Sequence, residues 1–265
     1  MRRLAVQRDL WKEAFQHWPQ LPCPTCKVGL LAVEQKKIIK EETTDSKKSY
    51  GHDAWEPDWI EKRFVAGLKC GNPVCADKIV SCGVISHEYY QFYHDDGSVG
   101  GDLIETFMPH YFEPAPPVFS MHESYPEIVC AELLKSFSLM WADVAAAATR
   151  VRVSVEFLMD ELKIPRKAKI KSGKNTGKYR EVTLDERIRK FSELNNDAGK
   201  QLMAVKWLGN TASHKSVSQF TRDDLLDSFE HIEFALDLIY VKTIARLAER
   251  ADKILKIKGP IKNKL

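Results

Sequence analysis

The chain has 265 residues, of which 44% are hydrophobic and 29% are charged, and its formal net charge is +3. This composition is typical of a globular protein and excludes the disordered and fibrous classes. No apolar run is long enough to cross a membrane, and the N-terminal segment MRRLAVQRDLWKEAF has charges where a secretory signal needs an apolar core. We therefore expect a cytoplasmic protein with no membrane partner.

The N-terminal part, residues 1–122, is predicted to be a strand-rich domain. Turn-forming residues separate its short β-prone runs, which are Val28–Val33, Ile79–Ile85 and Glu88–Tyr93. The polar run of residues 34–50 predicts a solvated loop or a ragged hairpin. Residues 110–119, HYFEPAPPVF, cannot continue a helix or a central strand because of their prolines, so we place the domain boundary just after them.

Four of the six cysteines form two close pairs, and we predict that they bind Zn²⁺. Each pair can make a turn that points two thiolates at one cation, and two such turns supply the tetrahedral sulfur ligands that Zn²⁺ prefers. Four protein ligands make the site closed and structural, so the metal would contribute to the folding free energy of a small domain. The predicted ligands are Cys23, Cys26, Cys70 and Cys75.

Two other interpretations of these cysteines stay open. The first pair, Cys23-Pro-Thr-Cys26, has the spacing of a redox motif, although no βαβ pattern surrounds it. The four side chains can also be buried free thiols. The two remaining cysteines, Cys82 in a predicted strand and Cys130 in a predicted helix, are interpreted as small buried hydrophobic residues.

From residue 123 onward the apolar residues recur at helical spacing, which predicts an α-helical bundle over residues 123–265. Two capping boxes, which start at Thr183 and Thr221, predict where two of the helices begin. The apolar stripe of the last helix is expected to continue from Leu225 as far as Ile254. A strand-rich domain followed by a helical bundle makes the predicted fold class α+β.

Residues 163–180 contain eight basic residues and no acidic one. Two glycines keep this basic segment flexible. One interpretation is a mobile loop that binds the phosphates of RNA or DNA. The other is a solvated linker between two helices. The residues predicted to contact phosphate are Lys167, Lys169, Lys171, Lys174, Lys178 and Arg180.

Two pairs of polar residues in the helical part are spaced one helical turn apart. Arg152 and Glu156 lie beside an apolar stripe, and we expect an ion pair between them at the edge of the core. Asn210 and His214 form the second pair if the helix continues through Gly209, and the amide of Asn210 can then orient the imidazole. Alternatively, Gly209 ends one helix as a left-handed cap, with Asn210 in the turn.

The segments RVRVSVE (150–156), TLDERIRKF (183–191) and KWLGNTASH (206–214) follow one another in an order that resembles the bacterial domain-of-unknown-function family numbered 4145. The segments CPTC, RFVAGLKCGNPVC and YFEPAPP resemble the zinc-knuckle region that precedes this domain in one subgroup. That family is similar to the HEPN superfamily of helical bundles, which includes metal-independent ribonucleases of toxin and antiphage systems and also inactive, scaffold-like members. The resemblance implies a HEPN-like bundle, and a homodimer because two copies often form the site together.

Active members of that superfamily carry an arginine four to six residues before a histidine. The histidine moves a proton, and the arginine neutralises charge that develops on the phosphate. In this chain the fourth and fifth positions before His214 hold Asn210 and Gly209. We therefore favour a non-catalytic, regulatory or scaffolding protein with a structural zinc, which acts with a protein partner in a bacterial defence or nucleic-acid-processing system.

Two alternatives to this function are kept. The first is a metal-independent endoribonuclease, in which His214 is catalytic, Asn210 orients it, and Arg152 or Lys206 contacts the phosphate. The second is a nucleic-acid-binding module that uses the basic segment without catalysis.

Overall fold

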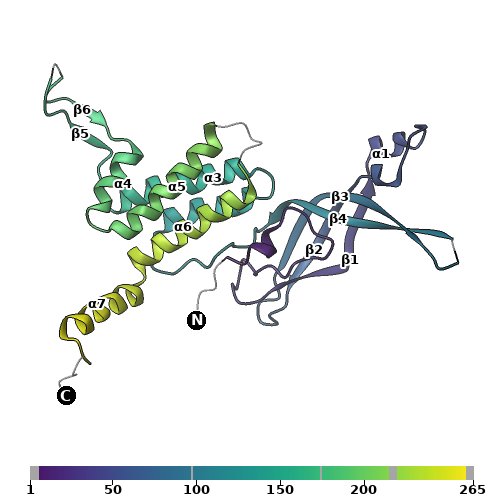
Figure 1. Ribbon diagram of the computed structural model, residues 1–265, viewed down its shortest axis with the longest axis horizontal. Coiled ribbons are helices and arrows are strands. Elements are labelled where there is room, and N and C mark those ends of the chain that lie inside the picture. Colours follow the sequence, from purple (N-terminus) through teal and green to yellow (C-terminus); the bar gives the residue numbers. More distant parts are fainter. Residues whose placement is uncertain (1–5, 97, 174, 215–219, 261–265) are drawn as a thin grey trace. The chain divides into compact units, whose positions relative to one another are not determined.

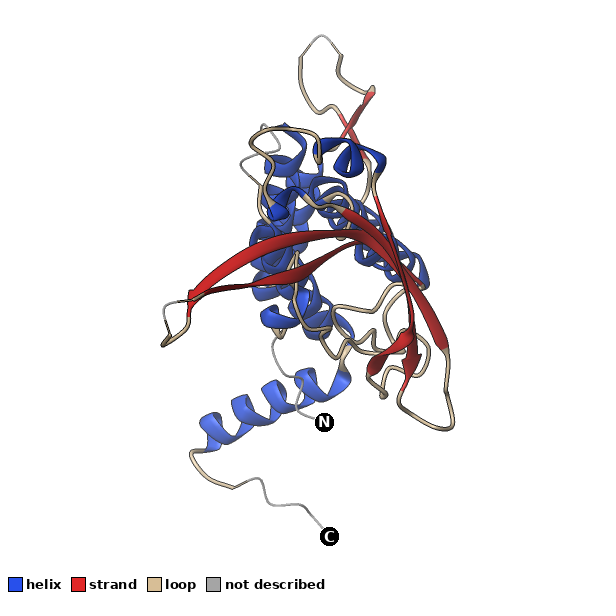
Figure 2. Ribbon diagram, turned by 90° about the vertical axis from the view of Figure 1, so that its right-hand side faces the viewer, coloured by secondary structure: helices blue, strands red, loops and turns tan. Residues whose placement is uncertain are grey.

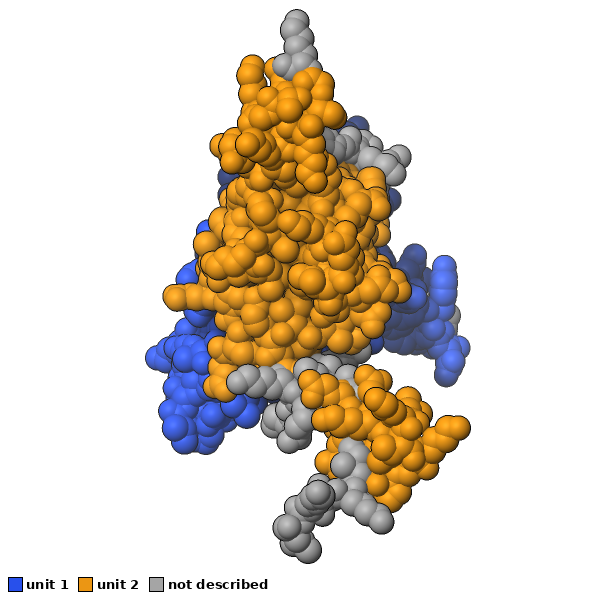
Figure 3. Space-filling model, turned by 90° about the vertical axis from the view of Figure 1, so that its left-hand side faces the viewer, with its two compact units in different colours: residues 1–120, 134–147 blue, residues 121–133, 148–265 orange. Residues whose placement is uncertain are grey.

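The computed structural model describes residues 6–96, 98–173, 175–214 and 220–260 (Figure 1). The chain divides into two compact units, which are coloured in Figure 3. Unit 1 contains residues 1–120 and 134–147, and unit 2 contains residues 121–133 and 148–265. The division into two domains, residues 1–122 and 123–265, stays a prediction.

Unit 1 is built on one antiparallel sheet, shown in red in Figure 2, whose strands lie in the order β1-β2-β3-β4. The strands are β1 (Leu31–Glu42), β2 (Lys62–Cys70), β3 (Lys78–Tyr93) and β4 (Val99–Glu113). Two 3-10 turns, Arg8–Trp11 and Pro57–Trp59, and the short helix α1 (Thr44–Ser49) complete this part of the chain. Both predictions for residues 34–50, a solvated loop and a ragged hairpin, are wrong. Strand β1 continues to Glu42 and α1 follows, with the side chain of Thr43 capping its N-terminus.

Strands β3 and β4 extend past the rest of the sheet. Strand β2 pairs with β3 only as far as Ile85, whereas β3 and β4 stay paired to Tyr93 and Val99. Residues 86–93 and 99–106 therefore form a two-stranded antiparallel arm, which we call the ribbon (Figure 1). The two β-prone runs predicted at Ile79–Ile85 and Glu88–Tyr93 are thus one continuous strand.

Aromatic side chains make the core of unit 1. Phe64, Ile85 and Phe107 are buried together, and Trp18 packs on both of these phenylalanine rings. The N-terminal segment reaches this core because Phe15 forms a backbone bridge with Phe107. Burial of large apolar side chains is the main favourable term in folding, so these rings hold the N-terminal segment against the sheet.

The helical part contains six longer helices, among the residues that the structure describes. They are α2 (Glu127–Leu139), α3 (Val144–Glu161), α4 (Leu184–Ser192), α5 (Asn196–His214), α6 (Arg222–Tyr240) and α7 (Lys242–Ile257). Both predicted capping boxes are confirmed: the side chains of Thr183 and Thr221 accept hydrogen bonds from backbone N–H groups at the starts of α4 and α6. The four-stranded sheet followed by helices confirms the α+β class.

The core of unit 2 is formed by one buried stripe on each of α3, α4, α5 and α6. Its fully buried members include Val151, Val155, Leu158, Ile188, Leu202, Phe229, Ile232 and Leu236. None of the described helices is both long enough and apolar enough to span a membrane.

The predicted continuation of the last helix from Leu225 to Ile254 is wrong. The helix stops at Tyr240, Val241 is extended, and α7 begins at Lys242 (Figure 1). Residues with β-branched side chains surround the break, in the run Ile239-Tyr-Val-Lys-Thr-Ile244, and such residues favour the helix less than unbranched ones do.

Candidate functional site

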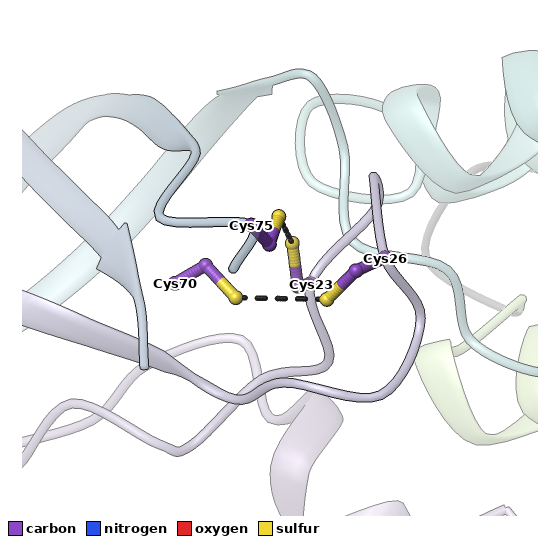
Figure 4. Close-up of side chains that lie close together, drawn as sticks. All are labelled: Cys23, Cys26, Cys70 and Cys75. Carbon is purple, nitrogen blue, oxygen red and sulfur yellow. Dashed lines mark hydrogen bonds between the residues drawn. The ribbon is translucent and has the colours of Figure 1, made fainter. Parts of the chain in front are cut away.

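Two turns of unit 1 bring the four predicted metal ligands together (Figure 4). Cys23 and Cys26 lie in the loop before β1, Cys70 ends β2, and Cys75 lies in the turn between β2 and β3. The four sulfur atoms all lie within 4.8 Å of one another, and a metal ion can be held between them.

The sulfur separations distinguish a metal site from a disulfide. The Sγ atoms of Cys23 and Cys75 are 3.9 Å apart, and those of Cys26 and Cys70 are 3.7 Å apart. A disulfide bond is about 2.05 Å long. Four sulfurs placed tetrahedrally at about 2.3 Å from Zn²⁺ lie about 3.8 Å from each other. All four cysteines are free thiols, and the two separations given above match those of a tetrahedral ligand set.

The two turns share a backbone feature. The residue directly after the second cysteine of each pair, Lys27 in one turn and Ala76 in the other, has a positive φ, 59° and 48°. In each turn its N–H also closes a hydrogen bond, from Lys27 to the carbonyl of Cys23 and from Ala76 to that of Asn72. This tight geometry directs both sulfurs of a pair to the same side.

Backbone N–H groups point at two of the sulfurs. The N–H of Gly29 donates to Cys26, and the N–H of Asn72 donates to Cys70. Hydrogen bonds from the N–H groups of Val28 and Gly29 lower the pKa of the Cys26 thiol to about 6, whereas burial raises the pKa of Cys70 to about 12. A bound cation favours thiolates and would offset the burial at Cys70.

Direct contacts tie the two turns to each other. The hydroxyl of Thr25 donates to the carboxylate of Asp77, and this bond lowers the pKa of Asp77. The N–H of Gly71 donates to the carbonyl of Leu30 at 2.9 Å. The protein's own hydrogen bonds therefore position the two cysteine pairs opposite each other.

Gly29 is the closest point between the two turns. A Cβ atom added to it would overlap the Sγ of Cys70 and would lie 2.9 Å from the Cβ of Asn72. Any larger residue at this position would push the second turn, and two of the four sulfurs, away from the first.

In unit 2, helix α5 runs without a break through Gly209, so the predicted left-handed cap at Gly209 is wrong. Gly209 is instead the place where α5 lies against α3. A Cβ atom at Gly209 would lie only 2.7 Å from the Cβ of Arg152, and the hydroxyls of Thr149 and Ser213 are 3.3 Å apart. The segments RVRVSVE and KWLGNTASH thus contact each other.

The charged residues of these two segments already have partners. The guanidinium of Arg152 lies 3.2 Å from the carboxylate of Glu156, which confirms the predicted ion pair. The ammonium of Lys206, on a largely buried side chain, donates to Asp185 at 3.2 Å. Asn210 is half-buried on α5. The backbone of His214 ends α5, but its side chain lies outside the described residues.

The basic segment forms a hairpin rather than an irregular loop. Strand β5 (Lys167–Lys169) pairs with β6 (Tyr179–Glu181), and the turn between them contains Gly173 and Gly177 with φ near 90° (Figure 1). Lys169, Lys171 and Lys178 are exposed, whereas Lys174 lies outside the described residues.

Two of the predicted phosphate ligands face carboxylates that follow the basic segment in the sequence. Arg180 forms two hydrogen bonds with Glu186, at 3.0 and 2.6 Å, and Lys167 lies 3.5 Å from Glu181. Arg180, together with the N–H of Thr183, lowers the pKa of Glu186 to about 2. These pairs reduce the net charge that the hairpin can offer to an anion.

Comparisons with known proteins agree with the resemblance of the helical part. Residues 135–257 match the family model described as Domain of unknown function (DUF4145), and residues 13–112 match a second one, Domain of unknown function (DUF8608). No curated protein and no solved structure matches the chain. The match over residues 135–257 confirms the family resemblance of the helical part.

We predict that Gly29→Ala weakens metal binding although it removes no ligand, because its methyl group overlaps the Sγ of Cys70. The affinity for Zn²⁺ is expected to fall at least about tenfold, which corresponds to about 1.4 kcal/mol. Competition with a chromogenic chelator measures it. Gly51→Ala is the matched control, since a Cβ at Gly51 meets nothing within 4 Å. Equal affinities of the two variants would contradict the prediction.

Proposed function

We propose that this chain, whose residues 135–257 carry the DUF4145 domain, is a non-catalytic helical-bundle protein with a structural zinc site. In this proposal it acts as a homodimeric regulatory or scaffolding partner in a bacterial defence or nucleic-acid-processing system. The observation that carries the proposal is the contact of Gly209 with Arg152, whose charge is paired with Glu156. These segments serve to pack α3 against α5.

The choice of zinc rests on the chemistry of the donors. Four thiolates in a tetrahedral arrangement suit Zn²⁺ or an iron–sulfur centre, and a single Zn²⁺ fits sulfurs that lie 3.7 and 3.9 Å apart in pairs. Four protein ligands leave no position for water or substrate, so the ion would hold the first loop to the β2–β3 turn. It would have no part in catalysis.

The ribonuclease alternative needs a cation that is free to stabilise the charge on phosphate. Arg152 and Lys206, the two cations considered for this role, are engaged by Glu156 and Asp185. A phosphate group would have to compete with a carboxylate for either of them, which weakens its attraction to the cation. This engagement is why we favour the non-catalytic function.

One observation favours nucleic-acid binding as a second candidate function. The β5–β6 hairpin extends away from the helices of its unit (Figure 1), and Lys169, Lys171 and Lys178 on it are exposed. Three lysines on a narrow hairpin suit sequence-independent contact with phosphates.

For the metal, elemental analysis of the purified protein is expected to find about one zinc per chain by the four-ligand stoichiometry. Cys70→Ser removes a ligand and should lower both the zinc content and the free energy of unfolding, the latter by more than about 3 kcal/mol. Cys82→Ser is the control, because Cys82 lies outside the four-sulfur cluster. Full zinc content and full stability in Cys70→Ser would refute ligation by four cysteines.

For the helical part, we expect no cleavage when the purified protein is incubated with labelled RNA in EDTA. His214→Ala should then behave like the wild type in this assay, because no turnover depends on the imidazole. RNA cleavage by the wild type that disappears in His214→Ala, with unchanged circular dichroism, would overturn the non-catalytic assignment in favour of the ribonuclease.

For the hairpin, the triple variant Lys169→Ala, Lys171→Ala, Lys178→Ala should bind single-stranded RNA more weakly than the wild type does. The slope of log affinity against log salt should become shallower by about 2, because each phosphate that a lysine neutralises contributes about 0.7 to it. A triple variant of exposed lysines elsewhere, Lys12→Ala, Lys47→Ala and Lys48→Ala, is the control. Identical slopes for the two triple variants would remove the hairpin as a phosphate-binding element.

A further inference from the structure

The ribbon of unit 1 exposes aromatic and aliphatic side chains on both of its faces. One face carries Tyr89 with its partner Leu103, and Tyr93 with its partner Val99. The other face carries Tyr90 and Phe92. All of these side chains are exposed, and Tyr93 is 76% accessible. Large exposed apolar clusters of this kind mark interaction surfaces, where tyrosine is enriched.

Two of these rings lie over glycines of the neighbouring strand. The ring of Tyr89 covers Gly101, and the ring of Phe92 covers Gly100, where an added Cβ would lie 2.6 Å from the ring. The Phe92 ring also meets His94 edge-on at 5.1 Å. Contact with the bare backbone limits the positions open to both rings, which lowers the entropy cost of binding.

The charge of the ribbon restricts its partner. Residues 79–134 contain no lysine or arginine. The ribbon and its turn carry five carboxylates: Glu88, Asp95, Asp96 and Asp102, and Glu105, which is paired with Lys40 and Lys62. Carboxylates repel phosphate, so RNA, DNA and anionic lipid surfaces are unsuitable. Aromatic rings beside carboxylates instead suit lysine and arginine side chains, because such cations bind both to the faces of aromatic rings and to carboxylates.

Helix α7 has the complementary properties. Its described side chains are exposed all round, including Leu247, Ile254 and Leu255, the last of which is 73% accessible. Leu247, Ala251 and Ile254 are spaced by four and three residues and so share one face. Residues 242–265 contain eight lysines and arginines against two acidic residues.

A 16-residue helix whose described side chains are all exposed is by itself only marginally stable in water, so a partner that covers its apolar face would stabilise it. An anionic lipid surface could receive α7, but it would leave the aromatic rings of the ribbon exposed. A second copy of this chain covers both surfaces. Repulsion between the basic sides opposes direct pairing of two α7 helices.

We propose that α7 of one copy binds the ribbon of a second copy, and that the reverse contact forms at the same time. The apolar face of α7 packs on the tyrosine rings, and Arg250 and Lys253, on one flank of that face, lie against the carboxylates of the ribbon. Two identical contacts related by a two-fold axis close the pair and double the buried area. This inference rests on the homodimer of the proposed function and identifies its surface.

The test is a charge swap measured by sedimentation velocity. The ribbon variant carries Glu88→Lys, Asp95→Lys and Asp102→Lys, and the helix variant carries Arg250→Glu and Lys253→Glu. Asp96 is left unchanged because it accepts hydrogen bonds from Ser98 in the turn. We expect the wild type to be a dimer that weakens as salt is raised. Each variant alone should be monomeric, and an equimolar mixture should dimerise, because each basic surface then meets an acidic one.

A variant of the apolar side of the interface needs no change in charge. Tyr90→Ser with Tyr93→Ser should weaken the wild-type dimer at least about tenfold, since aromatic side chains dominate such interfaces. Val74→Ser, at a side chain that is 95% exposed outside the ribbon, is the control. Circular dichroism and zinc content verify that each variant is folded.

The outcomes separate the ribbon–α7 interface from the homodimer itself. A wild type that stays monomeric at all concentrations overturns both. A wild-type dimer that survives in each charge variant overturns the ribbon–α7 interface and leaves the homodimer in place. Charge variants that are monomeric alone and also in the mixture overturn the reciprocal pairing.

Discussion

The structure of unit 1 depends on one constraint, the meeting of four sulfur atoms between two turns that are far apart in the sequence. The first turn precedes β1 and the second joins β2 to β3, so the sulfurs connect the start of the sheet to its middle. Gly29 sets how closely the turns approach, and the bond from Thr25 to Asp77 keeps them aligned. A small sheet with a modest aromatic core gains from such a connection, because it shortens the loops that folding must close.

Local chemistry explains which features could be predicted from the sequence. The cysteine spacing, the two capping boxes and the pair Arg152–Glu156 each depend on residues within one turn or one helix, and the structure contains all of them. The continuous strand β3 and the hairpin in the basic segment depend on pairing with distant residues. Composition alone does not indicate such pairing.

Gly209 shows the same limit in unit 2. A glycine near the end of an apolar stripe has the local signature of a helix cap, and only the position of Arg152 on another helix reveals why this residue lacks a side chain. The partners of the hairpin cations were also missed, because Glu181 and Glu186 come just after the segment whose charge was counted. A count of charged residues that runs from Lys163 through the capping box at Thr183 includes both of these glutamates.

The segment of residues 134–147 limits where recombination can divide the gene of this protein. Its residues 135–147 lie within the match to the family of the helical part, yet the whole segment belongs to unit 1, where Trp141 packs against Trp11 and Phe112. The chain therefore passes between the units three times rather than once. A genetic exchange at the proline-rich stretch would separate Trp141 from the rings that it covers. The parts of the gene that encode the sheet and the helices are thus expected to be transferred between genomes as one unit. Substitutions at Trp11, Phe112 and Trp141 are expected to be correlated.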